Sequence, residues 1–282
     1  MRVLITGANG QLGKELVKQL DKQHYSVFAT SRIDLDITKE SIVETKISQI
    51  RPDIIIHAAA YTDVDQAEFN KKTAFEVNAL GAFYVAREAK KIGAKMVYIS
   101  SDYVFSGDKS TPYNEDDPPN PISVYGASKW LGERLVRSTL QESYIIRTSW
   151  LYGHGGNNFV KTMINLAKQQ KEIKVVNDQV GSPTYTKDLV EIIHRIFNKG
   201  YGIYHVSNNC SCSWYEFARE IFLEVGNDPT LVISITTKEY GAATIRPSYS
   251  VMECKKLKTE GIKMPRSWQS ALHEFMKKEL AK

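Results

Sequence analysis

The chain has 282 residues, of which 42% are hydrophobic and 24% charged, and this composition excludes the disordered and fibrous classes of protein. Its 37 lysine and arginine residues outnumber the 32 acidic residues, which gives a net charge of +5 without a long basic run. Such a mild charge suits small anionic ligands and gives no electrostatic basis for binding nucleic acid or a membrane surface.

The first predicted strand covers residues 2–6. It leaves no room before it for the charged leader, apolar stretch and cleavage site of a signal peptide. The longest apolar stretch, residues 54–60, is far shorter than a membrane span. We therefore expect a cytoplasmic protein.

A glycine-rich loop follows this strand. Gly7, Gly10 and Gly13 lie at three-residue intervals between the strand and a helix predicted over residues 11–22. Glycines in this context let the backbone approach a pyrophosphate, which the N-terminus of the helix then holds. The pattern predicts a dinucleotide site whose loop residues are Gly7, Asn9, Gly10, Gln11, Leu12 and Gly13.

The second predicted strand, residues 25–30, leads into Ser31 and Arg32. An NAD-selective site normally carries an acidic residue here for the ribose hydroxyls, whereas Arg32 suits the 2′-phosphate of NADPH. Asp34 or Asp36 could still accept a ribose hydroxyl, and Arg32 could be a solvated surface charge. We expect NADPH, with NADH as the alternative. The expected cofactor contacts in this segment are Ser31, Arg32, Asp36 and Ile37.

The alternation of strands and helices continues to about residue 150. Further strands are predicted at 53–57, 95–100 and 143–148, and helices at 39–50, 70–91 and 122–140. This order is typical of a parallel sheet wound with helices on both faces, so we expect a Rossmann-like α/β fold. Ala58, Ala59 and Ala60 follow the third strand. Such small residues either permit close approach of a dinucleotide or serve tight packing.

Past residue 150 the pattern is less regular. Helices are predicted at 157–171, 187–198 and 213–225, with short strands near 173–176 and 203–206. We expect residues 1–150 to form mainly the dinucleotide-binding domain. Residues 151–282 should form mainly a smaller substrate-binding lobe, with segments that could return to the first domain.

Candidate catalytic groups lie around the predicted helix at 122–140. Tyr125 and Lys129 are four residues apart, hence on one face of that helix, and a nearby ammonium favours ionisation of a phenol. Ser101 follows the strand at 95–100, at the sheet edge where open α/β folds bind ligands. These groups suit carbonyl reduction by a cofactor hydride: Ser101 orients the carbonyl, Tyr125 protonates the alkoxide, and Lys129 tunes Tyr125 and contacts the nicotinamide ribose.

The glycine motif, Ser101 and the pair of Tyr125 and Lys129 resemble the extended short-chain dehydrogenase/reductase family. Segments spread over nearly the whole chain narrow this resemblance to the dTDP-4-dehydrorhamnose reductase family; they are residues 100–105, 147–153, 156–159, 177–179 and 246–247. Ser101 stands where many members have threonine, and it keeps the hydroxyl.

The resemblance implies an enzyme that reduces the C4 ketone of dTDP-4-dehydro-6-deoxy-L-mannose to dTDP-L-rhamnose, supplying a deoxysugar for surface polysaccharide. It implies that Ser101, Asp102, Tyr103 and Trp150 bind the nucleotide-sugar substrate and that Asn78 belongs to the cofactor surroundings. Trp150 could equally be a core aromatic. Some members are associated with magnesium and a glutamate-built dimer interface, but Lys187 stands near the expected acid. We therefore predict no required magnesium, and either a monomer or a homodimer.

Other functions on the same fold stay open. A sugar-nucleotide dehydratase would carry Asp-Glu after the strand-end hydroxyl, whereas Ser101 is followed by Asp102 and Tyr103. An epimerase regenerates its cofactor, so net consumption of NADPH distinguishes a reductase from it. The chain also resembles, more distantly, the non-catalytic, reductase-like regulatory subunit of methionine adenosyltransferase. The segments 147–153 and 156–159 match the reductase rather than that regulator.

Overall fold

A six-stranded parallel sheet forms the centre of the molecule. The computed structural model describes residues 1–23 and 25–281, and its main sheet has the strand order β10-β5-β4-β3-β1-β2. The strands are β1 (Arg2–Thr6), β2 (Ser26–Thr30), β3 (Ile54–His57), β4 (Lys95–Ser101), β5 (Ser143–Thr148) and β10 (Gly202–His205). All of their pairings are parallel. The predicted Rossmann-like α/β fold is confirmed.

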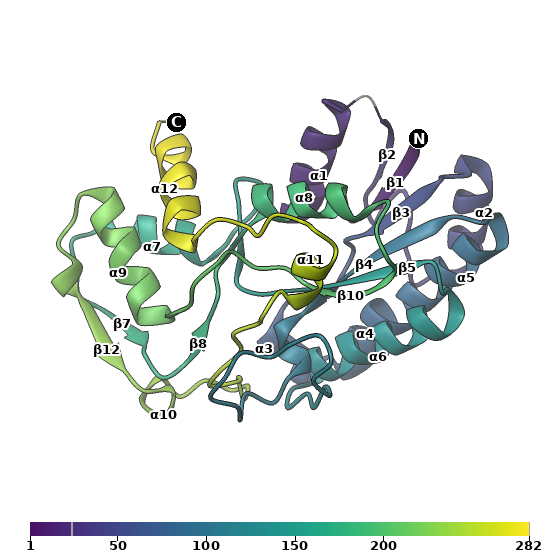
Figure 1. Cartoon of the computed structure of the whole chain (residues 1–282). Coiled ribbons are helices and arrows are strands. Elements are labelled where there is room, and N and C mark those ends of the chain that lie inside the picture. The colour runs from purple at the N-terminus through teal and green to yellow at the C-terminus, as the bar shows by residue number, and fades with distance from the viewer. Residues whose placement is uncertain (24, 282) are drawn as a thin grey trace.

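Helices cover both faces of this sheet. The helices α1 (Gln11–Asp21) and α8 (Thr186–Ile196) lie on one face, and α2 (Glu40–Ile50), α5 (Ala82–Ile92) and α6 (Val124–Thr139) on the other (Figure 1). Alternate strand residues supply the two cores, because successive side chains of a strand point to opposite faces. In β1, Val3 and Ile5 pack beneath α1 and α8, whereas Leu4 packs beneath α2 and α5.

The helical segment before β4 differs from the continuous helix predicted over 70–91. It begins with α3 (Val64–Phe69) and α4 (Lys71–Phe75), and continues through a π-helical turn, η1 (Glu76–Gly81), into α5. In a π turn the hydrogen bonds span five residues instead of four, which shifts the side chains that follow around the axis. Hydrophobic periodicity could not reveal this turn. Gly93, in the left-handed conformation, ends α5.

The second half of the chain builds a smaller lobe and also completes the sheet. The lobe, at the left of Figure 1, packs α7 (Phe159–Ala167), α9 (Trp214–Val225) and α12 (Trp268–Glu279) around a shared aromatic core. Its parallel pair joins β7 (Ile173–Val176) to β12 (Val232–Ile235). By contrast, β10 pairs with β5, and α8 packs against α1. The sequence patterns did not predict β12 or α12.

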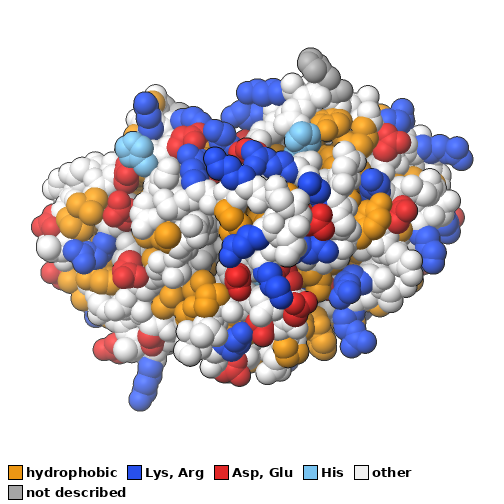
Figure 2. All heavy atoms as spheres, in the orientation of Figure 1, with side chains coloured by type: hydrophobic (Ala, Val, Ile, Leu, Met, Phe, Trp, Pro, Cys, Tyr) orange, Lys and Arg blue, Asp and Glu red, His pale blue; other side chains and the backbone are white. Residues whose placement is uncertain are grey.

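Short elements connect these parts. They are η2 (Asp102–Val104), β6 (Leu151–Tyr152), β8 (Val180–Gly181), β9 (Thr184–Tyr185), β11 (Cys212–Ser213), η3 (Pro229–Leu231), α10 (Thr237–Tyr240) and α11 (Lys255–Thr259). Within the described part of the chain, no helix combines the length and apolarity needed to cross a bilayer. On the face drawn in Figure 2, basic and acidic side chains are interspersed, as the small net charge leads one to expect.

Candidate active site

A cavity of about 770 Å³ lies at the carboxyl ends of β1 to β5 and reaches the lobe. Ligands of open α/β sheets bind at this edge. The predicted site residues that line it are Gly7, Asn9, Gly10, Gln11, Leu12, Gly13, Ser31, Arg32, Asp36, Ile37, Ala58, Ala59, Ala60, Ser101, Asp102, Tyr103, Tyr125, Lys129 and Trp150. Asn78 is the predicted residue that does not line it.

The glycine loop is packed too tightly for side chains. Gly7 has φ +68°, and a Cβ there would lie 2.7 Å from the Cα of Ala59. A Cβ on Gly13 would lie 2.2 Å from the carbonyl oxygen of Gly7. Gly10 is the N-cap of α1, and no side chain of the described residues caps that helix end. Its first N–H groups are therefore available to an anionic group such as a diphosphate.

After β2, Asp34 and Asp36 accept hydrogen bonds from residues close to them in the sequence. Asp34 accepts hydrogen bonds from the backbone N–H and the hydroxyl of Ser31, at 2.9 and 2.6 Å, and these bonds lower the pKa of Asp34. Asp36 accepts from the backbone N–H and hydroxyl of Thr38, at 3.0 and 2.8 Å. Arg32 is 82% exposed, and its Nε lies 4.0 Å from Asp36 Oδ2. This segment thus offers the cavity an exposed cation.

Ser101 and Tyr125 meet where β4 ends and α6 begins. Ser123 caps α6, since its hydroxyl accepts a hydrogen bond from the N–H of Gly126 at 3.1 Å, and this fixes Tyr125 in the first turn. Removal of the phenol from water raises the pKa of Tyr125 to about 12, although a side-chain hydrogen bond with Ser101 opposes that rise. Tyr125 is therefore protonated at neutral pH, the state that a proton donor requires.

Lys129 is buried one turn further along α6. It is 2% exposed, its Nζ donates a hydrogen bond to the carbonyl oxygen of Ile99 at 2.5 Å, and Nζ lies 4.3 Å from the ring centroid of Tyr98. Burial lowers the pKa of Lys129 to about 7, and the charge of Glu133 opposes this change. The expected lowering of the Tyr125 pKa by Lys129 is not seen, because burial of the phenol dominates.

The residues predicted to bind substrate line the cavity beside Tyr125. Asp102 is 1% exposed, and burial raises its pKa to about 6. The ring of Tyr103 meets that of Tyr125 edge to face, at a centroid distance of 5.6 Å. Trp150 stacks on Trp214 of α9, with the ring centroids 3.6 Å apart and an angle of 9° between the ring planes. Two nearly parallel indoles therefore meet where the lobe joins the cavity.

Asn78 lies behind the cavity rather than on its lining. It lies in the π turn η1 and is 1% exposed. Its side chain accepts a hydrogen bond from the N–H of Tyr61 at 2.8 Å and donates to the carbonyl oxygen of Tyr61 and to the hydroxyl of Ser128, at 3.0 and 2.9 Å. Asn78 therefore ties the loop after β3 to α6, behind the wall of the cavity.

Two further cavity residues were not predicted as site residues. Trp214 had no local signal in the sequence, because only the packing of α9 brings it to Trp150. Asn158 lies in the segment 156–159 that carried the family resemblance, but its role was not predicted: it donates a hydrogen bond to the side-chain oxygen of Gln11 at 2.7 Å, and so joins the lobe to the glycine loop. His57, at the end of β3, is buried and stacked on Tyr98, and burial lowers its pKa to about 3. Within the described residues, no three His, Cys, Asp or Glu side chains gather as metal ligands.

Comparisons with known proteins identify the family of the chain. The chain matches the family of the RmlD substrate binding domain over residues 1–281. It is 50% identical to the spore coat polysaccharide biosynthesis protein SpsK of Bacillus subtilis strain 168, covering 98% of this chain and 96% of that protein. It is 43% identical to a dTDP-4-dehydrorhamnose reductase of Aggregatibacter actinomycetemcomitans, covering 96% and 97% of the two chains.

A solved structure of a relative shares the fold of the whole chain. The crystal structure of the dTDP-4-dehydrorhamnose reductase of Bacillus anthracis strain Ames in complex with NADP superposes with a TM-score of 0.96, at 48% identity, over 98% of this chain and 99% of that one. The sequence match over 281 residues, the identities to full-length relatives and the shared fold lead to one conclusion. The chain belongs to the RmlD substrate binding domain family.

Proposed function

We propose that this protein is an NADPH-dependent reductase that converts the C4 ketone of dTDP-4-dehydro-6-deoxy-L-mannose into the hydroxyl of dTDP-L-rhamnose. The observation that carries the proposal is that Ser101, Tyr125 and Lys129 line the same cavity as the glycine loop. Family membership supports it, since relatives at 43% and 48% identity are named dTDP-4-dehydrorhamnose reductases.

The cavity fits a dinucleotide at its glycine end. Gly7 and Gly13 leave no space for a Cβ, and the uncapped start of α1 presents N–H groups for a diphosphate. Arg32 is the cation beside the expected ribose position, and it can form a charge-assisted contact with a 2′-phosphate. The related Bacillus anthracis enzyme was solved with NADP. NADPH is therefore the cofactor we assign, and when bound it supplies the hydride to the substrate carbonyl.

Three side chains, called the triad from here on, act on the carbonyl oxygen of the substrate or support those that do. They are Ser101, Tyr125 and Lys129. Ser101 orients that oxygen through its hydroxyl. Tyr125, which holds its proton at neutral pH, transfers the proton to the oxygen as negative charge develops there. The protonated form of Lys129 places positive charge beside Tyr125 and contacts the ribose of the cofactor. Replacing Lys129 with alanine should therefore reduce both turnover and cofactor affinity.

The opposite end of the cavity suits a nucleotide sugar. Asp102 and Tyr103 lie next to Ser101, and Trp150 with Trp214 forms an aromatic wall. Binding of the remote nucleotide places the ketone for hydride transfer, which is a contribution that the sugar alone cannot make. Bacillus subtilis SpsK is named for spore coat polysaccharide biosynthesis, and we propose that the product here likewise feeds a surface polysaccharide. A cytoplasmic location and a monomer or homodimer stay predictions.

The test is a turnover assay with purified protein, dTDP-4-dehydro-6-deoxy-L-mannose and NADPH. We expect one NADPH to be oxidised for each dTDP-L-rhamnose formed. Product formation without net NADPH oxidation would move the protein to the epimerases. Binding of the cofactor without any turnover would instead favour a regulatory role.

A further inference from the structure

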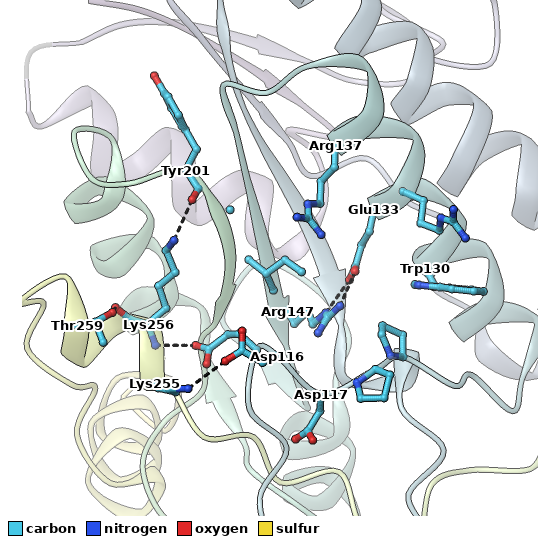
Figure 3. A pocket seen from close by; sticks show the side chains of 16 residues that line it. Asp116, Asp117, Trp130, Glu133, Arg137, Arg147, Tyr201, Lys255, Lys256 and Thr259 are labelled. Atoms are coloured by element: carbon cyan, nitrogen blue, oxygen red, sulfur yellow. Dashed lines mark hydrogen bonds and ion pairs between the residues drawn. The ribbon is translucent and has the colours of Figure 1, made fainter.

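A buried ion pair lies directly behind the triad. Arg147 on β5 is 1% exposed and Glu133 on α6 is 2% exposed. The guanidinium donates to both carboxylate oxygens, with Nε to Oε1 at 2.9 Å and Nη2 to Oε2 at 2.8 Å. Figure 3 shows this contact beside a second cavity, of about 820 Å³, which both side chains also line. That cavity contains none of the predicted site residues.

The same carboxylate reaches the strand that carries Ser101. The hydroxyl of Ser100 donates a hydrogen bond to Glu133 Oε1 at 2.5 Å. Ser100 and Arg147 are direct neighbours in the pairing of β4 with β5. Glu133 therefore joins α6 to both strands at the level of the triad, one residue before Ser101.

Lys129 and Glu133 are attached to consecutive residues of β4. They are one turn apart on α6, and both are buried. The Lys129 ammonium is hydrogen-bonded to the carbonyl oxygen of Ile99, and the Glu133 carboxylate to the hydroxyl of Ser100. Opposite charges at this spacing attract, and they attract more strongly where water is excluded.

Other titratable groups face Lys129 without balancing its charge. Tyr98 on β4 lies under the ammonium, and burial raises its pKa well above the ordinary value. Burial, and to a lesser extent the charge of Lys129, lowers the pKa of His57 on β3 to about 3. Tyr125 on α6 is also neutral at pH 7. Glu133 is the neighbour whose charge raises the pKa of Lys129.

We infer that Glu133, held in place by Arg147 and Ser100, is a positioning residue that keeps Lys129 protonated and directed at the carboxyl end of β4. The role in turnover rests on the proposed function, whereas the effect on Lys129 does not. If the counter-charge is removed, burial acts on Lys129 unopposed. Its ammonium then loses its proton at a lower pH, and the protonated form that the triad requires persists over a narrower range.

The experiment is a pH titration of Lys129 in the cofactor-free protein. The protein is labelled with ¹³C at the lysine ε-carbon and followed by NMR, and the Lys129 signal is assigned as the one missing from Lys129→Gln. We compare the wild type with Glu133→Gln and with the double variant Glu133→Gln/Arg147→Met. The double variant is needed because Glu133→Gln alone leaves the buried Arg147 guanidinium without its counter-charge and can prevent folding.

We expect the Lys129 midpoint to fall by about one pH unit or more in the double variant. The matched control is Asp188→Asn/Arg266→Met, which removes another bidentate pair, with contacts of 2.9 and 3.0 Å, outside the cavity. This control should leave the Lys129 midpoint unchanged. An unchanged midpoint in a folded Glu133→Gln/Arg147→Met variant would overturn the inference.

Turnover gives the second readout. With NADPH and ketosugar nucleotide, the alkaline limb of the kcat/KM profile should move to lower pH in the double variant and not in the control. If the wild type shows no turnover, the proposed function fails while the NMR result still decides the role of Glu133. If the NMR midpoint moves and the alkaline limb does not, the part of the inference that concerns turnover is wrong.

Discussion

Replacing Tyr125 with phenylalanine removes one hydroxyl and little else. The ring can keep its edge-to-face contact with Tyr103, at 5.6 Å. The hydroxyl of Ser101 can keep its hydrogen bonds to Asp102 Oδ1, at 2.9 Å, and from the N–H of Tyr103, at 3.2 Å. The fold and the glycine loop should therefore survive. What is lost is the positioned proton for the alkoxide, and such a loss typically lowers turnover by about two to four orders of magnitude. This corresponds to about 3 to 5 kcal/mol in the barrier.

The assay follows NADPH absorbance with the ketosugar nucleotide, and cofactor affinity is measured by fluorescence titration. We expect Tyr125→Phe to bind NADPH nearly as tightly as the wild type and to turn over far more slowly. The matched control is Tyr144→Phe, which removes a buried hydroxyl that donates to the carbonyl oxygens of Phe197 and Lys199, away from the cavity. Its turnover should stay close to normal. Near-normal turnover of Tyr125→Phe would refute the role of Tyr125 as the proton donor.

Three further predictions address the cofactor and the substrate. Arg32→Ala should raise the dissociation constant for NADPH by about tenfold and change that for NADH little, because a charge-assisted contact to the 2′-phosphate is lost. Both constants are measured by calorimetry, and equal shifts for the two cofactors would show that Arg32 is only a solvated surface charge. Gly13→Ala should weaken binding of both cofactors, because its Cβ would lie 2.2 Å from the carbonyl oxygen of Gly7 and force the loop to move. A folded Gly13→Ala variant with unchanged affinities would contradict the close packing of that loop. The free ketosugar should have a much lower kcat/KM than the nucleotide-linked sugar, and equal values would show that the nucleotide does not help to place the ketone.

Much of the sheet could be predicted from local patterns. Strands β1 and β5 have the predicted limits, 2–6 and 143–148, because short runs of β-branched and aromatic residues bounded by polar segments indicate strands directly. The glycine loop was predictable for the same reason, since its spacing between a strand and a helix reflects a local steric demand. The spacing of Tyr125 and Lys129 likewise depends on one helix only.

Tertiary structure decided which distant segments meet. Nothing in residues 202–205 shows that β10 pairs with β5 rather than within the lobe, and nothing near Trp214 indicates that it stacks on Trp150. Sequence alone does not show that Asn78, predicted to belong to the cofactor surroundings, contacts Tyr61 and Ser128 from the π turn.

The pKa values depended on tertiary structure even more strongly. The sequence places a cation four residues from Tyr125, but burial of each group decides that Tyr125 keeps its proton and that the pKa of Lys129 falls to about 7. Glu133 opposes that fall, and Arg147 on β5 holds its carboxylate. Local sequence determines backbone preference within one element, whereas desolvation and ion pairing depend on which elements pack together. The chemistry of this site was therefore visible in its residue types, and its protonation states only in the packing of α6 against β4 and β5.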